Sequence, residues 1–366
     1  MQKEGKFGYQ EAISMLVIAI SIKAFFSSPS AAIKVVGTSV WYMTLISSLT
    51  AAFLFIFQYQ LLKRFPDLSL MEISDRVLGK FGGSVLCLLL CVFFIFTASI
   101  DMREFVEVMK IFVLPESPPS FIMIIFSLCV VVLSFKGLEV IARFSRFIVY
   151  VLGAGFLSVI LMSFPNFRQY RLFPLFGYGL GKTVITGMVR SSFYGAVSVI
   201  GIFAASLHGP KEIKRIGLSA VFISGIVTSI TCIAIILTFP YTTAQELVSP
   251  MYAMASMVDL GGFFQRVEPI FLFLWNFGTF IEVTVLFHAA VMIYCHVFRI
   301  PDKRPVVLPM AIMMYGMKLY PGSLNEVSNL WVHLLRQWGW IPYFMPSVLL
   351  LIVSLIRKKR GDVNNA

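Results

Sequence analysis

Long apolar runs separated by short polar segments extend along almost the whole sequence. Ten runs approach the ~20 residues that a helix needs to cross the hydrocarbon core of a bilayer. They cover roughly 10–32, 38–61, 82–113, 119–135, 140–163, 183–207, 216–239, 264–297, 305–320 and 340–356. The fourth and ninth runs are short, but the charge pattern described next requires both. The pattern predicts an all-α integral membrane protein of about ten transmembrane helices.

Lys and Arg residues are distributed unequally between alternate loops. One set of loops, which includes both ends of the chain, holds nineteen of them, and the other set holds seven. Because basic residues favour the cytoplasmic side, this bias predicts that both termini are cytoplasmic, as an even number of spans requires. No segment suggests a soluble domain, so residues 1–366 are expected to form a single transmembrane domain.

The composition supports the same class of protein. Hydrophobic residues make up 58% of the chain and charged residues 13%, with a mean hydropathy of +0.86. Soluble domains have about 45–50% apolar and about 25% charged residues, so an ordinary soluble fold is excluded. The net charge of +12 lies in short clusters between apolar runs. It therefore indicates membrane topology and anionic lipid rather than nucleic acid.

Two runs contain residues that weaken a helix at mid-membrane depth. The first run carries Lys23 and then Ser27-Ser28-Pro29, and the sixth run is rich in Ser and Gly between Ser191 and Gly201. Matching interruptions in two halves of a chain are typical of inverted-repeat transporters, whose solute site lies at the interruptions. The Ser and Gly residues of the sixth run could instead serve only close helix packing. We expect a five-plus-five inverted repeat, with broken helices 1 and 6 and with repeats at about 10–163 and about 183–356.

Charged residues lie inside or at the end of three predicted spans. Lys23 lies in the middle of the first span and Glu282 in the middle of the eighth. A charge at this depth costs about 2.5–3.5 kcal/mol on insertion scales, so it usually faces a cavity or a partner. The two residues could form a structural ion pair or a charge pair at a ligand or ion site. The end of the third span, Asp101–Lys110, predicts a solvated or vestibule-lining face, from which Asp101 could reach a pocket.

No motif for covalent chemistry or metal binding is evident. Gly181-Lys182-Thr183 resembles the end of a phosphate-binding loop, but Phe176 stands where that loop needs its first glycine. His288 and His296 lie two helical turns apart with no third ligand in view. We therefore expect no catalytic residues, no metal and no cofactor. The chain is predicted to bind or pass a small solute and not to be an enzyme.

Three groups of residues carry a family resemblance over nearly the whole chain. They are Lys23–Pro29 with Gly37–Trp41, then Phe173–Gly179, and then Pro250–Tyr252 with Phe264–Glu268 and Trp275. In order and spacing they resemble the B subunits of bacterial spore germinant receptors, a branch of the amino acid–polyamine–organocation transporter superfamily. The resemblance implies a leucine-transporter-type fold. It also implies a nutrient-sensing subunit in the spore's inner membrane that acts with A and C receptor subunits.

The resemblance further implies a ligand pocket formed by the unwound parts of helices 1 and 6 together with helices 3 and 8. Carried over by position, this pocket includes Ile22, Lys23, Phe93, Thr97, Tyr194, Gly195, Glu282 and Leu286. The implied ligand is a small germinant such as an amino acid, a sugar or a nucleoside. The alternative function is a cation- or proton-coupled amino acid permease acting alone.

One departure from the family pattern concerns the break in helix 1. Some members have a small, glycine-containing stretch there, whereas this chain has Ser21-Ile22-Lys23. The Lys23 ammonium could replace a coupling cation near helix 8, or it could meet the carboxylate of the ligand. The first possibility favours a receptor that binds its ligand without sodium.

Overall fold

The computed structural model describes residues 5–258, 268–318 and 332–360, and this part of the chain contains helices and no strand. Its α-helices are α1 (Tyr9–Ser21), α2 (Ser28–Val36), α3 (Val40–Arg64), α4 (Leu70–Phe112), α5 (Pro119–Lys136), α6 (Leu138–Ser163), α7 (Leu180–Val189), α8 (Pro210–Thr238), α9 (Tyr241–Ala244), α10 (Pro250–Ser256), α11 (Glu268–Val297), α12 (Arg304–Lys318), α14 (His333–Trp338) and α15 (Trp340–Ile356). The 3₁₀ helices are η1 (Ile22–Phe25), η2 (Gly37–Ser39), η3 (Phe164–Asn166), η4 (Gln169–Leu172), η5 (Arg190–Gly201) and η6 (Ala204–Ser206). Residues 264–267 of the family-like stretch lie outside the described residues.

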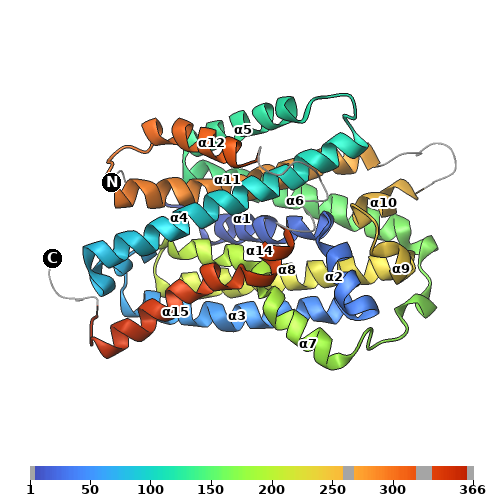
Figure 1. The fold of residues 1–366 in the computed structure, drawn as a ribbon, viewed down its shortest axis with the longest axis horizontal. Helices are drawn as coiled ribbons and strands as arrows, with labels where there is room; N and C mark the ends of the chain where they lie inside the picture. The colour runs from blue at the N-terminus through green and yellow to red at the C-terminus, as the bar shows by residue number, and fades with distance from the viewer. Residues whose placement is uncertain (1–4, 259–267, 319–331, 361–366) are drawn as a thin grey trace.

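Eight helical segments in the described part of the chain are long and apolar enough to cross a membrane. They comprise α2 with α3, α4, α5, α6 with η3, α7 with η5, α8, the greater part of α11, and α14 with α15. The helices α1 and α12 are too short to qualify by themselves, so the number of ten spans stays a prediction. Both ends of the chain lie at the same end of the bundle, which agrees with an even number of spans (Figure 1).

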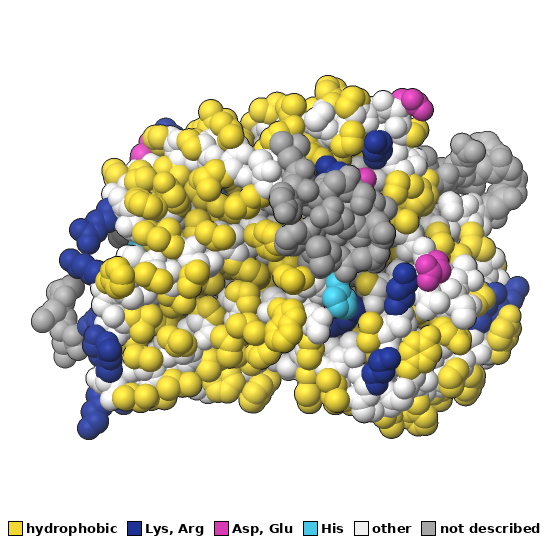
Figure 2. All heavy atoms as spheres, viewed as in Figure 1, with side chains coloured by type: hydrophobic (Ala, Val, Ile, Leu, Met, Phe, Trp, Pro, Cys, Tyr) yellow, Lys and Arg dark blue, Asp and Glu magenta, His cyan; other side chains and the backbone are white. Residues whose placement is uncertain are grey.

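Large apolar side chains cover much of the outside of the bundle. Phe81, Leu89 and Phe147 are 85%, 65% and 67% exposed, and Figure 2 shows a broad apolar surface with Lys and Arg at its left-hand end. Water would not solvate such a surface, whereas lipid chains would. The surface therefore belongs to an integral membrane protein, as the composition predicted.

The predicted break in the first span is confirmed. The helix α1 ends at Ser21, the tighter turn η1 follows, and Phe26 has non-helical angles before α2 begins at Ser28. Pro29 occupies the first turn of α2, where its fixed φ suits a helix and its missing N–H costs nothing. A short apolar helix thus stops and restarts in the middle of the bundle.

The sixth span is also interrupted, as its Ser and Gly content predicted. The helix α7 ends at Val189 and the chain continues as η5, a 3₁₀ segment of twelve residues. Runs of 3₁₀ helix longer than three or four residues are uncommon, and a stretch inside a span often marks strain or a functional hinge. The interruption of span 6 lies beside the first span, since η5 packs against α1, the helix that precedes the break in that span.

The third span begins earlier than predicted. The helix α4 begins at Leu70 after a capping box, in which the Ser69 N–H donates to Glu72 Oε2 at 2.8 Å. Gly79 then interrupts it with a φ of 84°, a conformation that glycine adopts readily and other residues rarely do. The predicted loop 62–81 therefore contains a helical segment, and the membrane part of α4 follows the kink.

Contacts between distant segments place the interruptions at the centre of the bundle. The helix α11 packs along α4 and against α1, while α3 packs along α8 and α15 (Figure 1). The 3₁₀ segment η5 lies against α3, α15 and α14. The first, sixth and eighth spans therefore pack on one another through α1, η5 and α11, and the third span joins them through α11.

Candidate solute-binding site

Lys23 and Glu282 form a buried ion pair. Lys23 Nζ lies 2.8 Å from Glu282 Oε1, and the two side chains are 2% and 1% exposed. Because removing a charge from water costs several kcal/mol, an ion this deeply buried persists when an opposite charge lies close to it. The structure therefore brings together the two residues singled out from the sequence, and η1 and α11 supply one each. Whether either contacts a ligand stays a prediction.

Asp101 extends this pair into a cluster of four charges. One carboxylate oxygen lies 3.8 Å from Lys23 Nζ, and the other lies 3.8 Å from the Arg336 guanidinium. Asp101 reaches the site from α4, as expected, and Arg336 reaches it from α14. Arg336 is one of the seven basic residues counted from the sequence in the loops of the opposite, outer side. That placement is wrong, because the side chain is 6% exposed and lies inside the bundle.

Three more charges at the end of the third span are also buried, whereas Lys110 is half-buried. The expectation of a solvated face is wrong, since Arg103, Glu104 and Glu107 are at most 9% exposed. Arg103 pairs with Glu107 one turn further along α4. Glu104 accepts hydrogen bonds from the Ser27 N–H, at 3.1 Å, and from the Ser27 hydroxyl. A carboxylate of α4 thus holds the backbone at the start of α2, where N–H groups have no partner within the helix.

Two further predicted residues meet at a tyrosine that the sequence gave no reason to select. The Phe93 ring lies edge-on to the Tyr343 ring, with centroids 4.8 Å apart. Gly195 lies against the same ring, because a Cβ added there would be 2.1 Å from Tyr343 Cδ2. The absence of a side chain at Gly195 therefore lets α15 approach η5 closely. Thr97 is buried one turn along α4 and donates to the Phe93 carbonyl oxygen at 2.9 Å.

The other three predicted residues lie around this cluster in different ways. The Tyr194 hydroxyl donates to the Thr44 carbonyl oxygen at 3.1 Å, so this ring points towards α3. Leu286 is completely buried one turn along α11 from Glu282. Ile22 packs on α11, where a Cβ added at Gly278 would lie 2.4 Å from Ile22 Cδ1. A ligand role for these residues stays a prediction.

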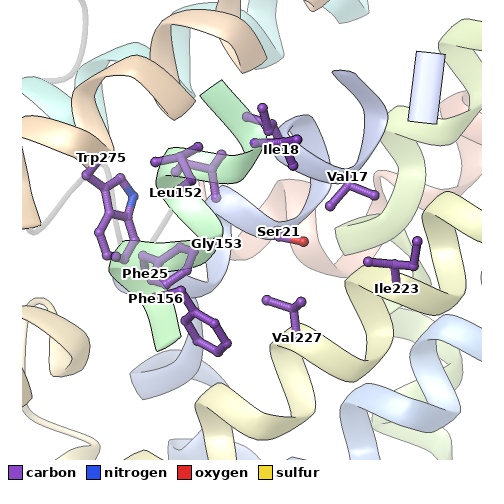
Figure 3. Close-up of a pocket in the computed structure, with 13 residues that line it drawn as sticks. Val17, Ile18, Ser21, Phe25, Leu152, Gly153, Phe156, Ile223, Val227 and Trp275 are labelled. Atoms are coloured by element: carbon purple, nitrogen blue, oxygen red, sulfur yellow. The ribbon is translucent and has the colours of Figure 1, made fainter. Parts of the chain in front are cut away.

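An apolar cavity of about 210 Å³ lies beside the charge cluster, between α1, η1, α6, α8 and α11 (Figure 3). Ile22, Phe25, Phe156 and Trp275 are among its lining residues. Ser21 is the one lining residue that carries a hydroxyl group. Since Ile22 precedes Lys23 in η1, this cavity and the charged residues occupy neighbouring faces of the same turn.

The described residues contain no group of three or more His, Cys, Asp and Glu side chains that could hold a metal ion. The two histidines of α11 have separate partners. His288 Nδ1 lies 2.9 Å from Ser134 Oγ, and His296 Nε2 lies 2.9 Å from Asp75 Oδ2. They do not converge on one point.

Interrupted helices around buried charges are typical of the fold that many membrane transporters share, and solved structures show the same fold. The chain superposes on Mhp1, a nucleobase-cation-symport-1 family transporter, with a TM-score of 0.70 and 12% identity, covering 97% of this chain and 91% of that one. A Na⁺-coupled sialic acid symporter matches with a TM-score of 0.66 and 12% identity, covering 96% and 90%. Both are transporters of the leucine-transporter fold, so the predicted fold type is confirmed.

Sequence comparison then defines the family. The chain belongs to the spore germination protein family, whose model matches residues 9–326. Spore germination protein KB of Bacillus subtilis (strain 168) is 23% identical over 342 residues, covering 89% of each chain. Spore germination proteins A2 and YndE of the same organism are 26% and 25% identical, over 321 and 330 residues, and cover 86–88% of each chain. The resemblance drawn from the sequence is confirmed, and this family is of a receptor or transporter type rather than enzymatic.

Proposed function

We propose that this protein is the nutrient-sensing subunit of a spore germination receptor, with a small solute bound where the breaks of spans 1 and 6 meet α4 and α11. The observation that carries the proposal is the buried Lys23–Glu282–Asp101 cluster at the end of α1. Ionisable groups at this depth are costly, and in bundles of this fold they serve solute or ion sites. Membership of the spore germination family gives this site a sensing role.

Ligand binding would act by shifting a two-state equilibrium. A solute that binds one arrangement of the interrupted helices more tightly than the other changes the population of that arrangement. The Glu104 side chain of α4 accepts a hydrogen bond from the backbone N–H of Ser27, so a movement of α4 would displace the backbone at the break in span 1. The change would pass to the partner subunits through the surface of the bundle.

The proposed ligand is an amino acid, a sugar or a nucleoside, and the proposed partners are the A and C receptor subunits in the spore's inner membrane. Lys23 places an ammonium group between two carboxylates, which is the charge arrangement that a bound cation would otherwise complete. We therefore expect ligand binding to need no sodium. The other possible role of Lys23, contact with a ligand carboxylate, requires the pair with Glu282 to open.

Calorimetric titration of the purified protein with amino acids, nucleosides and sugars tests the proposal. Each titration is run in sodium buffer and in a buffer with an organic cation. At least one solute is expected to bind equally well in both. Phe93→Ala should weaken that binding, whereas Phe81→Ala, on the same helix but 85% exposed, should not. If no tested solute binds and spores that carry Glu282→Ala germinate normally, the proposal of a solute site at this cluster is refuted.

Uptake by liposomes separates this function from the alternative of a permease acting alone. A coupled permease accumulates labelled amino acid against a gradient when a proton or cation gradient is imposed. A sensor that needs its partner subunits is expected to bind the same solute without accumulating it. Accumulation by the purified chain would therefore refute the sensing proposal in favour of transport.

A further inference from the structure

Arg190 is a buried cation without an acidic partner. It is the first residue of η5, it is 8% exposed, and its guanidinium donates to the Ala31 carbonyl oxygen at 3.0 Å. Within the described part of the chain no carboxylate lies at ion-pair distance from it. A buried charge in this situation is costly, because one carbonyl dipole replaces only part of its hydration.

Arg336 places a second guanidinium at the same point. Both arginines line a small cavity of about 30 Å³, between α2, α3, η5 and α8. Arg336 Nε donates to Ser28 Oγ at 3.3 Å, and its guanidinium lies 5.4 Å from the centre of the Phe193 ring. Among the described residues, the carboxylate at ion-pair distance from Arg336 is Asp101, which is 3.8 Å away and is shared with Lys23. Two positive groups thus face one cavity with a single shared counter-charge.

The other polar groups of the cavity add no negative charge. The hydroxyls of Ser47, Thr44, Tyr194 and Thr228 all donate to backbone carbonyl oxygens. Ser28 Oγ accepts from Arg336 and retains its own proton for a further acceptor. The unused donors around the cavity are therefore guanidinium N–H groups and one hydroxyl.

The buried carboxylates of the neighbourhood are engaged elsewhere. Glu282 pairs with Lys23, and Glu104 accepts two hydrogen bonds from Ser27. None of Asp101, Glu104 and Glu282 lines the cavity. Within residues 5–258, 268–318 and 332–360, no carboxylate thus supplies the charge that Arg190 lacks.

We propose that this cavity binds one small inorganic monoanion of the size of chloride, between Arg190, Arg336 and the hydroxyl of Ser28. A water molecule needs about 10–15 Å³ of such space, so about 30 Å³ suits a single ion. Pockets for organic ligands are about ten times larger. The bound anion would join α2, η5 and α14 in a cavity that Arg336 and Asp101 connect to the Lys23–Glu282 pair.

Thermal unfolding without nutrient is the first test, with the purified protein in sodium gluconate and sodium chloride or bromide added at constant ionic strength. A ligand present at 100 times its dissociation constant stabilises the folded protein by about 2.7 kcal/mol. We therefore expect the melting temperature to rise by about 5 °C and to level off as halide is added. Arg190→Gln should abolish the rise. Arg103→Gln is the matched control, because Arg103 is a buried arginine that already has a carboxylate partner. The melting temperature of this control should still rise with halide, even if the variant melts at a lower temperature than the unsubstituted protein.

A tethered carboxylate gives the complementary test. Met43 lines the cavity and is nearly as long as glutamate, so Met43→Glu places a negative charge beside the guanidinium groups. This variant should melt at the same temperature in gluconate and in chloride. Anomalous diffraction from bromide-soaked crystals of the unsubstituted protein should show a peak within hydrogen-bond distance of Arg190 and Arg336.

Three results would overturn the proposal. The first is a melting temperature of the unsubstituted protein that does not respond to halide. The second is an equal halide response in Arg190→Gln. The third is stabilisation by acetate or glycine with none by halide, which would assign the anionic group to the nutrient itself.

Discussion

Removing one member of the Lys23–Glu282 pair should cost more stability than removing both. Breaking a buried ion pair costs about 3–5 kcal/mol, because a charge is left without its partner. Lys23→Met leaves two carboxylates, Glu282 and Asp101, with Arg336 at 3.8 Å from the second as the nearest cation. Glu282→Gln leaves Lys23 with Asp101 at 3.8 Å, so this change should lie at the lower end of the range. The double variant replaces the pair by neutral groups of similar volume and should be close to neutral.

Thermal unfolding in a single detergent measures these differences. Cys87, Cys91, Cys232 and Cys295 are buried, so a thiol-reactive fluorescent dye reports the loss of structure, with exposed Cys129 as a constant background. With about 2–4 °C for each kcal/mol, each single variant should melt roughly 6–20 °C lower than the unsubstituted protein.

An exposed ion pair in the same chain provides the control. Lys34 and Glu246 lie 3.5 Å apart and their side chains are 47% and 66% exposed. Such a pair contributes about 0–1 kcal/mol, so Lys34→Met and Glu246→Gln should each shift melting by a few degrees at most. If the loss in the Lys23→Met/Glu282→Gln double variant equals the sum of the single losses, the two residues are not coupled and the reasoning fails.

Three further changes test local packing by the same melting assay. Gly195→Ala should lower stability by about 1–3 kcal/mol, because its Cβ would overlap a ring of α15, whereas Gly316→Ala meets open space and should not. Gly153→Leu should raise the melting temperature by a few degrees, since this residue lines the apolar cavity and a Cβ there meets nothing within 4 Å; a decrease would contradict that geometry. Ser27→Ala should cost about 1–3 kcal/mol, because the Glu104 carboxylate loses one of its two donors; an unchanged melting temperature would show that the hydroxyl is dispensable.

Much of the fold follows from local properties of the chain. Transmembrane character and the break at Lys23–Pro29 depend on which residues adjoin one another, because hydropathy and backbone preference act within one segment. The pairing of Lys23 with Glu282 was a reasonable expectation for a related reason. A charge inside a bilayer needs a partner, and few opposite charges lie at that depth.

The tertiary structure decided how the remaining charges are used. The end of the third span was expected to be solvated or to line a vestibule because it is rich in charge, yet Asp101 and Glu104 are buried. Asp101 meets Lys23 of η1 and Arg336 of α14, and Glu104 meets Ser27. Arg336 and Tyr343 carried no local signal at all, and they reach the site because α14 and α15 pack against η5. Sequence patterns therefore determined that this protein crosses a membrane with interrupted helices. Only packing between segments far apart in the chain decided which side chains share the centre of the bundle, since a local pattern does not specify which helix faces meet.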